Sequence, residues 1–181
     1  MKLEPARRLA ELIRGILAPF CEKLEIAGSI RRQRPEVSDI DFVVLPKYGH
    51  LAGLKARCQR RCRVVKDGEQ NYIVAMPISA AQREQLGHSG WEVQIDIFIA
   101  HAGKRDLLQS IPSNYGSLLL CRTGSTAHNI WIVERAKANY MTWKPYEGVF
   151  DPEGYCVAAE TEEEIFRMIG VDWLAPERRE R

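Results

Sequence analysis

The chain has 181 residues, of which 45% are hydrophobic and 28% charged, and its formal net charge is +2. This length suffices for one hydrophobic core or for two small subdomains that share one, so we expect no third domain. No apolar run approaches membrane-spanning length, and the first residues, MKLEPARRLAELIRG, are too charged for a signal peptide. We therefore expect an intracellular protein without a membrane segment, in which any contact with nucleic acid depends on local basic clusters.

Hydrophobic spacing predicts the elements of the first half of the chain. A helix over residues 5–20 begins with Pro5 in its first turn, and its predicted core stripe comprises Leu9, Leu12, Ile13, Ile16, Leu17 and Phe20. Strands are predicted over residues 24–28, 38–45, 63–67, 71–76 and 91–99. A helical stretch over residues 51–61 and a polar loop over residues 77–90 complete this half.

Helical signals return in the second half. Helices are predicted over residues 104–110, 114–121 and 125–138, the last with Ser125 as its cap. Short strands are predicted within residues 146–155. Thr161 and Glu164 then form a capping box for a final helix that Gly170 ends. The sequence thus predicts an α+β fold with a mainly antiparallel sheet packed on helices and a small α+β unit that begins near residue 112.

Two carboxylates share one face of the predicted strand over residues 38–45. Ile40, Phe42 and Val44 alternate with Asp39 and Asp41, as the two-residue period of a strand requires. The two backbone positions are roughly 7 Å apart, so their side chains can converge on metal ions about 3.5–4 Å apart, the spacing of two-metal phosphoryl-transfer sites. Alone, this Asp-x-Asp pattern is common on solvent-facing strands.

A third carboxylate comes from the strand over residues 91–99. Asp96 is the acid in the middle of this strand, on the face opposite Val93, Ile95, Ile97 and Ile99. If the strand pairs beside the first, at about 4.8 Å, Asp96 joins Asp39 and Asp41 in one cluster of oxygen ligands. Such ligands suit Mg²⁺ or Mn²⁺.

An anion-binding turn precedes the carboxylates in the chain. Gly28 and Ser29 follow a short apolar strand and open a helical turn, where backbone N–H groups and the Ser29 hydroxyl can face phosphate oxygens. Arg31 and Arg32 come next, and a guanidinium contacts phosphate through two N–H groups at once. The alternative for each arginine is a solvated surface charge, but the order of turn, arginines and acids favours a triphosphate site.

These residues resemble the nucleotidyltransferase superfamily that includes DNA polymerase beta, and a second block narrows the resemblance to family X DNA polymerases. The segment YGSLLLCRTGSTAHNIWIVERAKA over residues 115–138 is similar to the family segment with a Thr-Gly-Ser turn beneath the nucleotide sugar, here Thr123, Gly124 and Ser125. Asn129 matches a downstream asparagine of that family. Residues 140–181 resemble its thumb. The resemblance extends from about residue 24 to the end of the chain.

The resemblance implies a minimal DNA-directed DNA polymerase with a palm over residues 1–111 and a thumb-like subdomain over residues 112–181, without lyase or fingers domains. It implies addition of nucleotides to a primer 3′-hydroxyl, with Asp39 and Asp41 binding two Mg²⁺ ions, for which Mn²⁺ can substitute, and Asp96 binding the catalytic ion. Gly28, Ser29 and Arg32 would contact the triphosphate, while Thr123, Gly124, Ser125 and Asn129 would contact the nucleotide.

The missing domains favour short gap-filling repair synthesis of low processivity. The expected partners are primer-template or gapped DNA and nucleoside triphosphates, with a ligase or a DNA end-binding protein as a further candidate. We expect a monomer in the cytoplasm, associated with the nucleoid if the source is bacterial or archaeal. Two alternatives stay open: a nucleotidyltransferase that modifies a small molecule, RNA or protein, and a non-catalytic nucleic-acid-binding module.

The chain also departs from the family pattern. Better-known members place two aromatic residues before Thr-Gly-Ser, where this chain has Cys121 and Arg122, and Val133 stands where relatives carry a basic residue. The smaller Cys121 leaves room for a 2′-hydroxyl, so the sequence predicts a relaxed preference for deoxynucleotides. His128 is expected to be a solvated helix residue or, alternatively, to face the nucleotide.

Local basic clusters and cysteines complete the pattern. The clusters comprise Arg57, Arg60, Arg61 and Arg63; Lys104 and Arg105; and Arg178, Arg179 and Arg181. Such runs are more often solvated faces than phosphate contacts. Five cysteines without a CxxC pair favour reduced structural thiols over disulfides or a zinc site.

Overall fold

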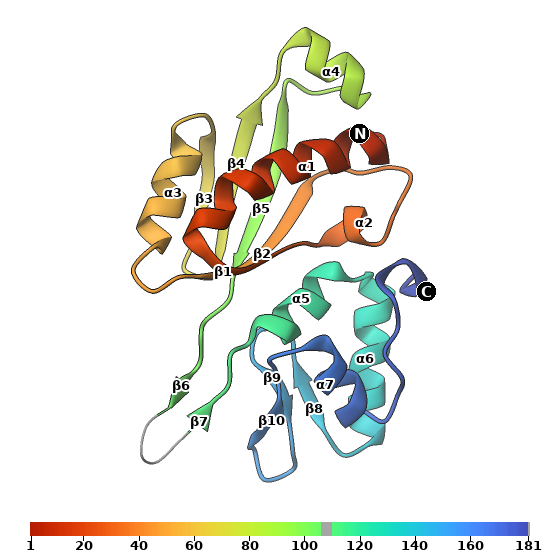
Figure 1. Cartoon of the computed structure of the whole chain (residues 1–181). Coiled ribbons are helices and arrows are strands. Elements are labelled where there is room, and N and C mark those ends of the chain that lie inside the picture. The colour runs from red at the N-terminus through yellow and green to blue at the C-terminus, as the bar shows by residue number, and fades with distance from the viewer. Residues whose placement is uncertain (106–109, 181) are drawn as a thin grey trace. The chain divides into compact units, whose positions relative to one another are not determined.

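The computed structural model describes residues 1–105 and 110–180 and divides the chain into two compact units, Met1–Ile99 and Ala100–Arg181 (Figure 1). The first unit ends at Ile99, twelve residues before the end of the palm predicted from the sequence at residue 111. The extents of the palm and thumb subdomains stay a prediction. Among the described residues, no helix combines the length and apolar character needed to cross a membrane.

The first unit is built on a five-stranded sheet in the order β1-β2-β5-β4-β3. Its strands are β1 (Cys21–Ile26), β2 (Ile40–Pro46), β3 (Arg63–Asp67), β4 (Asn71–Pro77) and β5 (Glu92–Ile99). Every neighbouring pair is antiparallel except β2 and β5, which run parallel. The predicted α+β fold with a mainly antiparallel sheet is therefore confirmed, and the one parallel pair lies at the predicted acids.

Helix α1 (Leu3–Leu17), with a following 3₁₀ turn at Ala18–Phe20, packs on one face of this sheet through a stripe that differs from the predicted one. Its buried residues are Ala6, Ala10, Ile13 and Leu17. Leu12 is 69% exposed and Ile16 is 38% exposed, so these two members of the predicted core stripe lie outside the core. The prediction was wrong here because it assigned the large aliphatic Leu12 to the core. The face that packs instead contains Ala6 and Ala10, whose small side chains let α1 lie close to the sheet.

The remaining helices of the first unit are short. They are α2 (Gly28–Arg31), α3 (Leu51–Gln59) and α4 (Ala80–Leu86). Helix α2 takes the place of the end of the predicted strand over residues 24–28, since β1 ends at Ile26. Helix α4 lies within the predicted loop over residues 77–90, where Ser79 and Gln82 form a capping box. The loop prediction was therefore wrong over residues 80–86. The Ser-x-x-Gln spacing is a recognised signal for the start of a helix, and it was present in the sequence.

The second unit surrounds a three-stranded antiparallel sheet, β10-β9-β8, with helices. The elements are α5 (Tyr115–Thr123), α6 (Thr126–Ala138), β8 (Thr142–Lys144), β9 (Gly148–Phe150), β10 (Cys156–Ala158), α7 (Glu162–Met168) and a 3₁₀ turn at Pro176–Arg178. Its core includes Leu120, Ile132 and Phe166. Thr161 accepts a hydrogen bond from the Glu164 N–H, which is one half of the predicted capping box, and so caps α7; Gly170 follows the helix with a positive φ of 69°, as predicted.

The helix predicted over residues 104–110 is wrong at both ends. Two short antiparallel strands, β6 (Lys104–Arg105) and β7 (Ser110–Ile111), pair with each other there. Residues 106–109, which belong to the same prediction, lie outside the described residues.

Candidate active site

The parallel pairing of β2 and β5 brings the three predicted carboxylates together. The register places Asp41 opposite Asp96, and Asp39 immediately precedes β2. One carboxylate oxygen from each of Asp39, Asp41 and Asp96 lies within 4.8 Å of the other two. The side chains of Ile40 and Phe42 are fully buried in the core, so strand alternation directs Asp41 to the opposite face. The resulting carboxylate cluster is a set of oxygen donors suited to a hard divalent cation.

Neighbouring polar side chains orient two of these carboxylates. The Ser38 hydroxyl donates to Asp39 Oδ1 at 2.7 Å, and the Gln94 amide donates from Nε2 to Asp96 Oδ1 at 2.8 Å. The sequence analysis gave Gln94 no role. The usable signal was the two-residue spacing between Gln94 and Asp96, which puts both side chains on one side of β5.

Gly28 lies against Asp41 at the start of α2. Its φ is +58°, and a Cβ built on it would lie 1.8 Å from Asp41 Oδ2 and 2.7 Å from Cγ. The Ala27 N–H also donates to the Asp41 backbone carbonyl at 2.9 Å. The turn that the sequence assigned to phosphate binding is thus built directly onto the carboxylate cluster, and only glycine fits there.

The Ser29 hydroxyl beside Gly28 is buried and has no hydrogen-bond partner within the described part of the chain. An unpartnered buried hydroxyl costs stability, and a polar ligand can recover that cost. Arg31 and Arg32 follow on α2 and just beyond it, and both are partly buried. A serine donor and two guanidinium groups next to three carboxylates suit a metal-bound polyphosphate.

The Thr-Gly-Ser turn in the second unit joins α5 to α6. Thr123 ends α5, Gly124 has a φ of +68°, and the Gly124–Ser125 peptide is cis. Ser125 caps α6 by accepting from the His128 N–H at 3.3 Å, as its predicted cap role requires. Its hydroxyl and its backbone N–H both donate to the Arg179 carbonyl, at 3.0 and 3.3 Å. The turn is therefore held by the C-terminal segment.

Asn129 is the fourth predicted nucleotide contact in this unit, and its side-chain amide nitrogen forms a hydrogen bond within the protein. Nδ2 donates to the Cys121 carbonyl at 2.9 Å, while Oδ1 is buried without a hydrogen-bond partner among the described residues. The Arg122 guanidinium lies 4.9 Å from the centroid of the Tyr146 ring. Burial raises the pKa of the Cys121 thiol, so this side chain is neutral beside the turn.

His128 is a core residue, which neither sequence interpretation anticipated. Its side chain is fully buried, with ring centroids 5.6 Å from Trp131 and 6.0 Å from Phe166. The aromatic residue Trp143 is also buried and donates from its indole nitrogen to Ser117 Oγ. The local sequence did not identify His128 as a core residue, because its partner Phe166 comes from α7, more than thirty residues away, whereas Trp131 lies on α6 itself.

Two of the arginines in the basic clusters form internal ion pairs. Arg63 pairs with Glu92 at 2.6 Å on the surface. Arg179 is fully buried and contacts both carboxylate oxygens of Glu162, at 2.7 and 3.0 Å. Arg179 is thus a structural residue of the second unit and unavailable to phosphate, and Arg181 lies outside the described residues.

Comparisons with known proteins agree with this geometry. The DNA polymerase beta thumb family matches residues 118–180. Human DNA-directed DNA/RNA polymerase mu is 27% identical over 180 residues, which cover 85% of this chain and 36% of the relative. The chain thus spans about a third of the length of that relative.

Two solved structures share the fold of the whole chain. They are Leishmania infantum polymerase beta in a ternary P/T complex and in a ternary gap complex, each with a TM-score of 0.75 and covering 100% of this chain. They match over 77% and 71% of their own chains at 15% and 14% identity, which establishes the palm- and thumb-like fold alone. The thumb match, the human relative and the shared fold together support a protein that resembles family X DNA polymerases.

Proposed function

We propose that the chain is a DNA-directed DNA polymerase that adds nucleotides to a primer 3′-hydroxyl by a two-metal mechanism, in short gap-filling synthesis of low processivity. The observation that carries the proposal is the carboxylate cluster, in which three oxygens from Asp39, Asp41 and Asp96 lie within 4.8 Å of one another. This arrangement is the donor set that two-metal phosphoryl transfer requires.

The residues present fit Mg²⁺, for which Mn²⁺ can substitute. Asp39 and Asp41 would hold two ions and Asp96 one. The Asp41 carboxylate fits beside Gly28 because glycine has no Cβ at that point. When bound, the ions would lower the pKa of the primer hydroxyl and offset the negative charge of the phosphates.

The side chains have separate tasks in this proposal. Ser29 would donate its buried hydroxyl to a phosphate oxygen, which would give that hydroxyl the partner it lacks within the described chain. Arg32 would add a charged contact to the β- and γ-phosphates. The hydrogen bond from Gln94 fixes Asp96 Oδ1, so that Asp96 can accept the proton of the 3′-hydroxyl.

The sugar would lie against Thr123, Gly124 and Ser125, where the absence of a side chain on Gly124 allows close approach. Cys121 is smaller than an aromatic residue, and we infer relaxed discrimination against ribonucleotides. The human relative is named as a DNA/RNA polymerase, and this supports the inference.

The partners proposed are gapped or primer-template DNA and nucleoside triphosphates, in line with the ternary complexes of the Leishmania polymerase. A ligase or DNA end-binding protein would supply further grip on DNA. We also propose that the protein acts as an intracellular monomer.

Primer extension tests this function. Labelled one-nucleotide-gapped, open-template and single-stranded DNA are compared with Mg²⁺ and with Mn²⁺, using dNTPs or NTPs at low salt. Asp96→Asn should abolish templated addition, while Asp172→Asn, a change at an exposed acid of the second unit, should retain it. The absence of addition by the wild-type chain on all three substrates would refute the proposal and favour a different nucleotidyl acceptor or a non-catalytic module.

A further inference from the structure

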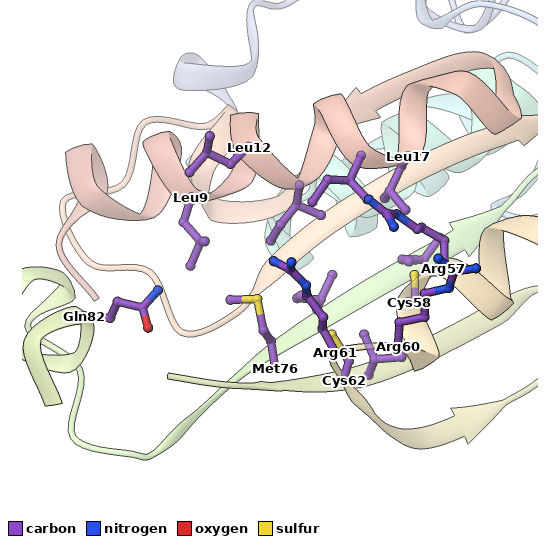
Figure 2. Close-up of a pocket in the computed structure, with 15 residues that line it drawn as sticks. Leu9, Leu12, Leu17, Arg57, Cys58, Arg60, Arg61, Cys62, Met76 and Gln82 are labelled. Atoms are coloured by element: carbon purple, nitrogen blue, oxygen red, sulfur yellow. The ribbon is translucent and has the colours of Figure 1, made fainter. Parts of the chain in front are cut away.

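An open pocket of about 620 Å³ lies between α1 and one face of the main sheet, and it belongs to no part of the proposed active site (Figure 2). Its apolar lining comes from three elements: Leu9, Leu12, Ile13, Ile16 and Leu17 of α1, Val74 and Met76 of β4, and Ile95 and Ile97 of β5. Cys58, Cys62 and Gln82 add to the wall. We call this pocket the α1 groove.

The α1 groove faces away from the carboxylate cluster. Ile95 and Ile97 line the groove, and Asp96 between them points to the other face of β5 by strand alternation. A molecule bound in the groove would therefore leave the site of nucleotidyl transfer open.

The apolar surface continues out of the groove onto the exposed side of α1. Leu12 is 69% exposed and Ile16 38% exposed, although both carry large aliphatic side chains. From Leu9 to Leu17 the strip extends for eight residues, or about 12 Å along the helix axis. A contiguous apolar strip of this kind marks an interaction surface more often than isolated exposed residues do.

The charged residues along the groove are all basic. Arg57, Arg60 and Arg61, from the end of α3 and the turn after it, line one end, and no Asp or Glu is among the lining residues of the described chain (Figure 2). Within the described ranges, none of the three guanidinium groups forms an ion pair or a side-chain hydrogen bond with another residue. Three like charges beside an apolar wall repel one another, and a ligand with carboxylates would relieve that repulsion.

We propose that the α1 groove docks an acidic amphipathic helix of a partner protein. Apolar side chains of that helix at i, i+4 and i+7 would enter the groove along α1, and its carboxylates would pair with Arg57, Arg60 and Arg61 at one end. The apolar wall disfavours nucleic acid, whose phosphates need polar contacts along their whole length. A second copy of this chain fits poorly, because its acidic helix α7 buries Ile165 and Phe166.

The test is an NMR titration of the full ¹⁵N-labelled chain with two synthetic helical peptides of about 16 residues. One carries leucine at i, i+4 and i+7 with glutamate on the flanking positions, and the other has the same composition in scrambled order. We expect the first peptide to shift resonances of α1, the end of α3 and β4 in a saturable manner. The scrambled peptide should not.

Two groove variants and two matched controls decide the outcome. Leu12→Gln, and Arg60→Glu combined with Arg61→Glu, should each weaken binding about tenfold or more, since each removes exposed contact groups without touching the core. Arg8→Glu, on α1 outside the groove, and Ile130→Gln, at a residue 56% exposed in the second unit, should not weaken it.

Other outcomes overturn the proposal. They are no shifts at about millimolar peptide, equal binding of the scrambled peptide, and shifts of the same groove resonances by duplex DNA or by self-association. Primer extension by the groove variants should equal that of wild type, so failure of docking is distinguishable from failure of the proposed polymerase.

Discussion

Replacing Gly28 with alanine is expected to displace Asp41 from the carboxylate cluster and to weaken metal binding. The added Cβ would lie 1.8 Å from Asp41 Oδ2, and real Cβ contacts are longer than 3.0 Å, so the carboxylate must move by at least about 1.2 Å. A displacement of about 1 Å at a reacting centre costs roughly 10²-fold in rate. We expect at least that loss of nucleotidyl transfer and a similar weakening of Mn²⁺ binding.

A matched control separates this clash from backbone strain. Gly28 has a φ of +58° and Gly49 a φ of +76°, but a Cβ on Gly49 meets nothing within 4 Å. Each alanine should therefore cost roughly 1–2 kcal/mol of stability through its left-handed backbone. Only Gly28→Ala should also affect the metal site.

Isothermal titration of Mn²⁺ into both variants, with urea unfolding for stability, measures the two effects separately. Wild-type Mn²⁺ affinity in Gly28→Ala would refute the reasoning, because it would show that Asp41 does not need its present position to bind the ion. Loss of Mn²⁺ affinity in both variants would assign the effect to general loosening of the first unit.

Three other changes test separate parts of the structure. Gln94→Leu removes the 2.8 Å hydrogen bond to Asp96 and should weaken Mn²⁺ binding about 10–100-fold with unchanged unfolding; unchanged affinity would contradict the orienting role. Arg179→Met leaves Glu162 buried without its partner and should lower the free energy of unfolding in urea by about 3–5 kcal/mol. A loss below about 1 kcal/mol would show that the ion pair does not stabilise the fold. Burial and neighbouring thiols raise the pKa of Cys58 from 9.0 to about 12. The free energy of unfolding that this thiol contributes is therefore complete below pH 9 and falls as the pH rises toward 12. In urea unfolding across this pH range, Cys58→Ala should show a smaller fall.

The sequence predicted that the three acids lie together because one alternation fixes both the buried face and the acid face of each strand. In β2, Ile40 and Phe42 must be buried, and the two-residue period then fixes the direction of Asp41. The same holds for Asp96 between Ile95 and Ile97. What the local pattern left open was the neighbour of each strand, and the parallel β2–β5 pairing depends on contacts across more than fifty residues.

The prediction of the α1 core face was wrong because the sequence allows more than one apolar stripe along the helix. Residues 5–20 contain enough leucine and isoleucine for two overlapping stripes, and the packed stripe of α1 uses Ala6 and Ala10, which a search for large side chains passes over. The contact between Gly28 and Asp41 had no sequence signal beyond the glycine itself. Such close approaches are set by tertiary packing and appear only in three dimensions.

The register of β2 against β5 links the stability of the first unit to its proposed chemistry. A slip by one residue would turn Ile95 and Ile97 to the acid face and bury Asp96 in their place. Burying each of those aliphatic side chains stabilises the fold by about 1.5–3 kcal/mol, and an unpaired buried carboxylate costs several more. The slipped register is therefore strongly disfavoured before any metal binds. Burial of the hydrophobic face thus holds Asp41 and Asp96 side by side, and the repulsion between their carboxylates is the part of the free energy that a divalent cation would offset.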